Sequence, residues 1–171
     1  WGELSLDGRL ATGPGAESDL TAQWVLTLTA EWLAPGAAVT VQGGGHVGGA
    51  FQEPHLTLRL ESPVPFDASG TVAWQETPPR WQAQFAWSAV DPSRLYALWP
   101  AVSLGGQGWV TGRGGAFVVA LAGTAAQAQA GRWAFDGAAS YGAAGVQLER
   151  LTLRPLDGAG EMQWQGSWSG G

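Results

Sequence analysis

Cysteine and lysine are both missing from this sequence, and charged residues make up only 13% of its 171 positions. Without cysteine the chain can form no disulfide framework, no thiol nucleophile and no cysteine metal site. The basic residues are all arginine, and the formal net charge is −6. Because a nucleic-acid backbone is bound by a basic stripe or patch, this balance argues against a nucleic-acid partner.

Long apolar runs are also lacking, as is the usual start of a chain. No stretch approaches the apolar length of about 18 residues that a membrane-crossing helix needs. The sequence opens on Trp1 without an initiator methionine or a signal peptide and stops at Ser-Gly-Gly. We therefore expect residues 1–171 to be a single segment cut from a longer chain.

Glycine and tryptophan are abundant instead, with 27 and 11 copies. This composition favours a sheet bounded by glycine turns over a helical protein. The clearest pattern is the stretch 20–32, in which every even position from Leu20 to Trp32 is apolar and only Val25 interrupts the polar odd positions. Alternation with a period of two predicts one long strand with an apolar side and a polar side.

The same alternation recurs along the chain and predicts an all-β fold, a long antiparallel meander of about eleven strands with turns at glycine and proline clusters. One short helix is expected at 91–99, where Asp91 can cap the first turn and Pro92 suits the first helical position. The expected strands are 4–10, 20–32, 37–47, 55–62, 70–76, 80–89, 102–113, 116–123, 128–141, 145–154 and 158–168.

The chain also repeats itself. The tetrapeptide LTLR occurs at 56–59 and again at 151–154, and the two copies are followed by the similar glycine-led segments GTVAWQ and GEMQWQ. Reuse of one strand-turn-strand unit predicts an internal repeat with halves near 1–76 and 102–168, and it favours an extensible array over a closed globule.

Catalytic signatures are weak throughout. A serine or threonine nucleophile would need His46 or His55 as its base, and neither histidine accompanies a nucleophile-elbow motif such as GxSxG. The carboxylates are scattered singly, and GGGHVGG at 43–49 lacks the GK[ST] of a phosphate loop. A hairpin centred on Phe51 would set His46 opposite His55 with Glu53 near the turn, but this spacing is too weak to carry a metal site. We expect no enzyme, no cofactor and no metal.

The tryptophans are the strongest chemical signal. Three interpretations compete for them: the core of a β-sandwich, an exposed platform that stacks against sugars, and the lining of a groove in an open curved sheet. The length of the stretch 20–32 and the hairpin connections count against a sandwich. Trp81, Trp109 and Trp168 fall near predicted strand ends, whereas five others share the apolar register of a strand: Trp24, Trp74, Trp87, Trp133 and Trp164.

Two passages resemble the C-terminal region of the TamB family, the AsmA-like proteins of the translocation and assembly module in diderm bacteria. The first is WQAQFAWSAVDPSRLYALWP at 81–100, a tryptophan-bearing strand followed by a DP helix start and a closing WP. The second is the unit LTLRPLDGAGEMQWQGSW at 151–168. The resemblance lies in the general residue pattern over most of the chain and not in an invariant motif. The chain is richer in glycine and tryptophan than the family pattern.

This resemblance implies a β-taco, a long sheet curled into an open half-pipe with an apolar interior, as part of a repeating β-groove bridge between two membranes. Family members are anchored in the inner membrane, span the periplasm and are linked to phospholipid transport in outer-membrane biogenesis. They work with the outer-membrane protein TamA in assembling β-barrel proteins. The family has no catalytic residues to carry over.

The hydrophobic groove would bind phospholipid or other acyl chains. Its open edge strands would be continued by neighbouring segments of the parent chain, so the isolated chain should self-associate edge to edge. Two alternatives remain: a tryptophan-rich carbohydrate-binding β-sandwich, and an outer-membrane barrel whose apolar face points at lipid. The residues expected to line the groove are Leu20, Trp24, Leu26, Leu28, Leu56, Leu58, Leu60, Val72, Trp74, Phe85, Trp87, Val119, Leu121, Trp133, Phe135, Met162 and Trp164.

Overall fold

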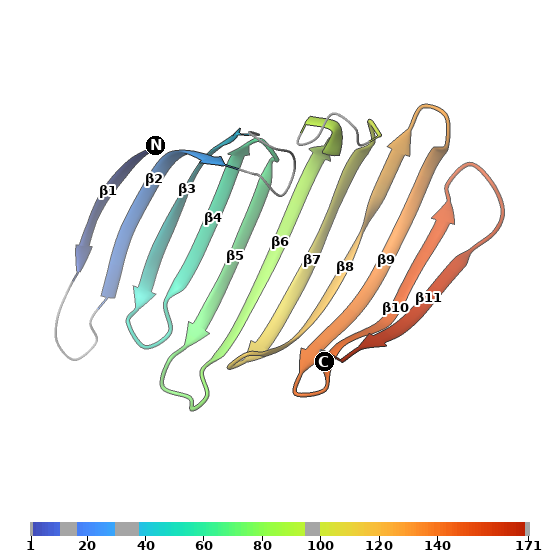
Figure 1. Ribbon diagram of the computed structural model, residues 1–171. Coiled ribbons are helices and arrows are strands. Elements are labelled where there is room, and N and C mark those ends of the chain that lie inside the picture. The colour runs from blue at the N-terminus through green and yellow to red at the C-terminus, as the bar shows by residue number, and fades with distance from the viewer. Residues whose placement is uncertain (1, 11–16, 30–37, 95–99, 170–171) are drawn as a thin grey trace.

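Backbone pairing turns this alternation into a single sheet (Figure 1). The computed structural model describes residues 2–10, 17–29, 38–94 and 100–169. The strands are β1 Gly2–Leu10, β2 Glu17–Thr29, β3 Ala38–Ala50, β4 His55–Ser62, β5 Phe66–Ala73, β6 Arg80–Val90, β7 Ser103–Arg113, β8 Ala116–Gln127, β9 Gly131–Gly142, β10 Gly145–Pro155 and β11 Met162–Trp168.

Every strand pairs with the next one in the sequence, so the order of strands in space is their order in the chain (Figure 1). All of these pairs are antiparallel. Antiparallel strands can be joined by a short hairpin, whereas parallel strands need a long crossover connection. β1 and β11 are the two edges, and the sheet stays open. The structure thus confirms the predicted meander of eleven strands in one open, curled sheet.

The pairing registers gather the apolar side chains on one side of this sheet. Side chains alternate along each strand, so directly opposed partners on neighbouring strands share a side. We call the two sides the apolar face and the polar face. One row of the apolar face runs from Trp24 through Gly43, Leu60, Phe66, Trp87, Gly106, Gly123, Phe135 and Leu153 to Met162. The adjacent row of the polar face runs from Gln23 through Gly44, Arg59, Asp67, Ala86, Gln107, Ala122, Asp136 and Thr152 to Gln163.

The part of the chain that the structure describes forms one layer only. All eleven strands belong to the same sheet, and no large side chain among the described residues is fully buried. Apolar side chains pack sideways against neighbours on their own face. The ring centroids of Phe66 and Phe85 are 6.1 Å apart, and those of Phe85 and Trp87 are 5.9 Å apart. A sandwich of two sheets, one of the alternatives, is therefore not the fold.

Glycines make room for this sideways packing. Trp87 on β6 and Phe135 on β9 stack with centroids 6.4 Å apart, and Gly106 and Gly123 occupy the two strand positions between them. A Cβ atom on Gly106 would lie 2.5 Å from Cζ2 of Trp87, and one on Gly123 would lie 2.6 Å from Cζ of Phe135. Both rings therefore lie over glycine backbone, where a side chain would displace them.

Three local expectations differ from the structure. The third strand does not dissolve in its glycine run, because β3 stays paired with β2 as far as Ala50. Trp74 lies in the turn after β5 and not in the strand. The described part of the helix expected at 91–99 is a single 3-10 turn, Pro92–Arg94, in which the Ser93 amide donates to Oδ1 of Asp91 at 3.0 Å.

Some expectations reach beyond the described residues. Residues 95–99 of the expected helix and residues 30–32 of the long strand lie outside them. No helix in the described part of the chain is long and apolar enough to cross a membrane.

The two copies of LTLR lie in β4 and β10, each of which is the first strand of a hairpin. Their pairing differs, because Leu56 lies opposite Gly70 whereas Leu151 lies opposite Trp164. The division into two repeat halves stays a prediction.

Replacing Gly106 or Gly123 by alanine should destabilise the protein, because the added Cβ forces Trp87 or Phe135 off the backbone that it covers. We expect each change to lower the free energy of unfolding by about 1–3 kcal/mol, measured by urea denaturation. Gly142→Ala is the matched control, since nothing lies within 4 Å of a Cβ at this end of β9. Equal losses at all three positions would contradict the packing of rings over glycines.

Candidate functional site

The residues expected to line a groove come together on the apolar face, with one exception. Trp74 lies beyond the end of β5 and is 56% exposed. All the other residues belong to the register of the apolar face. Leu28 is assigned to it by its backbone pairing with Val39. They come from β2 (Leu20, Trp24, Leu26 and Leu28), β4 (Leu56, Leu58 and Leu60), β5 (Val72), β6 (Phe85 and Trp87), β8 (Val119 and Leu121), β9 (Trp133 and Phe135) and β11 (Met162 and Trp164).

Four further strands, β1, β3, β7 and β10, pair in this register and were left out of the prediction. Glycines interrupt the apolar pattern of β3 and β7, which hides the register in the sequence. A bulge between Leu148 and Arg150 shifts the register of β10 against β9, so its alternation changes phase within the strand. The residues missed for these reasons include Val41, Val47, Leu104, Val110, Leu151 and Leu153.

The apolar face carries no charge. Among the described strands, no residue paired in the apolar register is an aspartate, glutamate, lysine or arginine. Several of its side chains stay open to solvent, such as Leu58 at 36% and Trp164 at 42% exposure. A contiguous apolar surface of this kind marks a site of interaction with a protein, lipid or ligand.

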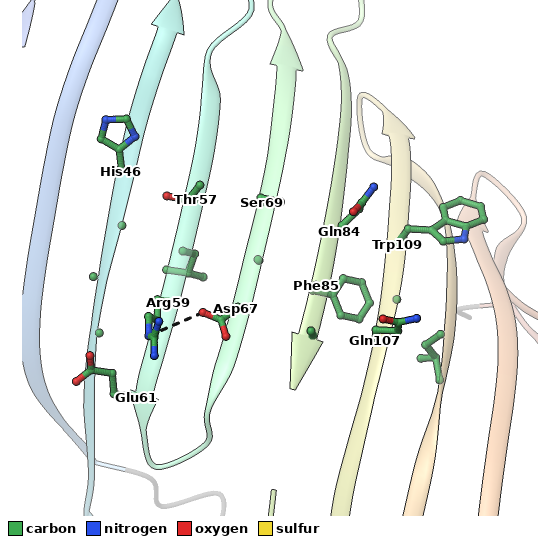
Figure 2. Close-up of a pocket in the computed structure, with 18 of the residues that line it drawn as sticks. His46, Thr57, Arg59, Glu61, Asp67, Ser69, Gln84, Phe85, Gln107 and Trp109 are labelled. Atoms are coloured by element: carbon green, nitrogen blue, oxygen red, sulfur yellow. Dashed lines mark ion pairs between the residues drawn. The ribbon is translucent and has the colours of Figure 1, made fainter. Parts of the chain in front are cut away.

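A large hollow, about 1660 Å³, opens on the other side of the sheet (Figure 2). Several central strands line it with three successive residues, for example 84–86 on β6 and 107–109 on β7. Residues i and i+2 of a strand point to the same side. The outer two residues of these triplets, such as Gln84 and Ala86, belong to the polar face, and their side chains surround the hollow.

The expected apolar interior is therefore not what this hollow presents. Because side chains of the polar face surround the hollow, the polar face is the concave one at mid-strand, and the apolar face is the opposite surface. Alternation along a strand separates two sides but carries no information about which side the sheet bends toward, because curvature arises from twist and bulges accumulated over many strands.

Charged side chains in the hollow are paired across strands. Nε of Arg59 on β4 lies 3.9 Å from Oδ1 of Asp67 on β5. At the other end, Asp136 on β9 receives Arg150 at 2.9 Å and Arg154 at 2.7 Å, both from β10. These pairs are exposed or half-buried, so each adds little to stability, but they leave the centre of the hollow without a free charge.

His46 and His55 do not face each other as the hairpin interpretation required. The turn after β3 shifts the register by two residues, so His46 lies opposite Thr57 and His55 lies opposite Gly48. Nε2 of His46 lies 2.8 Å from Oδ1 of Asp19 on β2. Among the described residues, no three side chains of the metal-ligating types gather into one group.

Trp109 is the site residue that the sequence interpretation placed wrongly. It lies in the middle of β7, not near a strand end, and it lines the hollow with 47% of its surface exposed. Its signal in the sequence is its parity, since Trp109 alternates in step with Gln107 and Thr111 and out of step with Val110. A tryptophan in the polar register is a rule-breaking residue of the kind expected at functional sites.

A second, smaller hollow of about 540 Å³ lies at the β11 edge of the apolar face. Trp164 and Trp168 of β11 and Leu148, Leu151 and Leu153 of β10 line it. This edge therefore presents two indole rings beside unpaired strand backbone.

Comparison with known protein families, with curated proteins and with solved structures gives no match.

Because no second layer of the described residues covers the apolar face, the native protein should bind the dye 1-anilinonaphthalene-8-sulfonate. We expect dye fluorescence to rise on mixing with folded protein while the near-UV circular dichroism of the tryptophans is retained. Retained near-UV signal distinguishes this from a molten globule, which also binds the dye. No dye binding by the native state would mean that the face is covered in solution.

Proposed function

We propose that this chain is a periplasmic segment of a TamB-like bridge between the inner and outer membranes, and that its apolar face holds phospholipid acyl chains on their way to the outer membrane. One observation carries the proposal: in the described chain an uncharged apolar register crosses every strand of a single sheet that no second sheet covers. The resemblance of residues 81–100 and 151–168 to the TamB family supplies the membrane setting. The proposal assigns no catalytic residue.

The energetics of the apolar face suit an acyl chain. A methylene group that leaves water for an apolar surface gains about 0.8 kcal/mol when fully buried, and it needs no specific polar contact. The aromatic rings on this face lie over neighbouring glycines, as Phe85 does over Gly108, where a Cβ would lie 2.6 Å from its Cζ. Apolar contact is thus available on many strands, so binding energy is spread along the face and not concentrated at one pocket.

The dimensions favour movement of a lipid along the face. The eleven strands are separated by ten spacings of about 4.8 Å each, so the rows are roughly 48 Å long. The acyl chains of one leaflet fill about half of a hydrocarbon core that is about 30 Å thick. A phospholipid would therefore cover only part of the face, and successive strands offer nearly equivalent positions for it to move between.

The edges of the sheet support a role within a longer assembly. β1 and β11 expose unpaired backbone, which is the surface that another strand adds to. A neighbouring segment of the parent chain would extend the apolar face in register. An unfolded strand of an outer-membrane protein could add to the same edges, which is how a contribution to β-barrel assembly with a TamA-like partner would arise.

A matched pair of charges on the two faces tests the acyl-chain site. Leu58→Asp and Leu26→Arg place a charge on the apolar face, whereas Thr57→Asp and Thr27→Arg place the same charges one residue away on the polar face. Loss of contact with about two methylenes should reduce crosslinking to a phospholipid with a photoreactive acyl chain about tenfold for the first pair. The second pair should crosslink like the unmodified protein.

All four variants need circular dichroism spectra that match the unmodified protein, so that lost crosslinking is not lost folding. Equal crosslinking by all folded variants would refute the acyl-chain site. Equal loss in both pairs would refute the assignment of the two faces.

A further inference from the structure

Trp109 is out of place on the polar face, and its surroundings point to a ligand of its own. It lies at mid-strand in β7, faces the hollow, and leaves 47% of its surface exposed. The apolar face, where other tryptophans pack, is on the opposite side of the sheet. Acyl-chain binding on that face therefore gives no account of this ring.

The neighbours of Trp109 leave one side of the ring free. Ala120 on β8 lies directly opposite it, and Ala138 on β9 follows in the same row. Ala122 lies in the adjacent row, opposite Gln107. Because an alanine side chain ends at Cβ, this half of the hollow has space above the sheet beside the indole.

Amide side chains flank the other side of Trp109 (Figure 2). Gln84 on β6 lies directly opposite Trp109, and Gln107 precedes it by two residues on the same face of β7. Within the described chain neither amide makes a side-chain hydrogen bond, whereas the nearby Gln82 donates to Oγ1 of Thr71 at 3.3 Å. Two unpaired amides and an open indole thus share one hollow.

These groups match a sugar. Each glutamine amide offers two donors and an acceptor, which suits hydroxyl groups that both donate and accept. An indole presents a flat apolar surface that can stack against the C–H face of a pyranose ring. The nearest charged groups, the Arg59–Asp67 and Asp136–Arg150 pairs, are compensated and lie on other strands, so the centre favours a neutral ligand over an anion.

We propose that the hollow binds a linear, neutral oligosaccharide whose pyranose rings carry equatorial substituents, with one ring stacked on Trp109 and its hydroxyls bound by Gln84 and Gln107. Equatorial substitution leaves axial C–H groups on both faces of the ring, which stacking requires. The row continues from Gln84 to Ser69 and Thr57, each directly opposite the next. Its spacing of about 4.8 Å per strand is close to the length of one sugar in an extended β-linked chain.

Calorimetric titration of the whole chain with cellohexaose and with chitohexaose tests this site. We expect at least one of these β-linked hexasaccharides to bind, and Trp109→Ala to weaken its affinity about tenfold through the lost stacking surface. The double variant Gln84→Ala with Gln107→Ala should weaken it by a similar factor. Maltohexaose, whose α-linked chain coils, should bind more weakly than either.

Trp164→Ala is the matched control, because it removes an exposed indole from the apolar face. It should leave the saccharide affinity unchanged, and Trp109→Ala should leave acyl-chain crosslinking unchanged. The two proposed sites are therefore tested independently of each other. Circular dichroism verifies that each variant is folded. Failure of both β-linked hexasaccharides to bind at millimolar concentration, or full binding by folded Trp109→Ala, would overturn the proposal.

Discussion

The side chains of the apolar face have only one another to pack against, and the rest of the structure depends on this constraint. No second sheet covers them in the described chain, so stability must come from contacts that run across strands on a single surface. Large rings achieve this where glycines on the next strand let them lie over the backbone, as Trp81 does over Gly112, where a Cβ would lie 2.5 Å from Cε2 of the indole. Glycine is therefore a packing residue in this sheet and not only a turn residue.

This way of packing explains why the strands keep a simple register from one edge to the other. A slip by one residue would turn a strand's rings to the polar side and leave its glycines without cover. Where the register does change, the chain uses bulges, as between Trp87 and Val90 on β6, where Ala89 has a φ of 51°. Such bulges bend a strand and increase its twist, which gives the sheet its curvature.

Curvature and alternation together produce two different surfaces on one thin layer. The apolar face is uncharged and even, which suits a ligand that is bound without specific contacts. The polar face is concave and carries the exposed indole of Trp109 beside unpaired amides, which suits a ligand that is bound by stacking and hydrogen bonds. The layer is only one sheet thick, so ligands on the two faces would lie on opposite sides of the same backbone. Each ligand would nevertheless contact its own set of side chains.

Residues such as Leu20, Trp24 and Leu26 could be assigned to one face from the sequence because alternation along a strand is a local property. The glycine run of β3 could not be assigned in this way, since its pairing depends on Leu60 and Trp24 from the neighbouring strands. The prediction that His46 lies opposite His55 was wrong, because a turn of different length shifts every pair of residues that follows it. The parity of Trp109 placed it on the polar face, but its importance could not be predicted from the sequence. Only the folded sheet brings Gln84 and the alanines around it.

The sequence by itself determined the number of strands, their order as hairpins and the two sides of the clearly alternating strands such as β2, because strand periodicity and turn chemistry act over a few residues. Tertiary structure alone decided that, over the described residues, no second sheet closes over the apolar face and that the hollow opens on the polar one. Both depend on twist and register summed over eleven strands, and no single stretch of the chain contains that information.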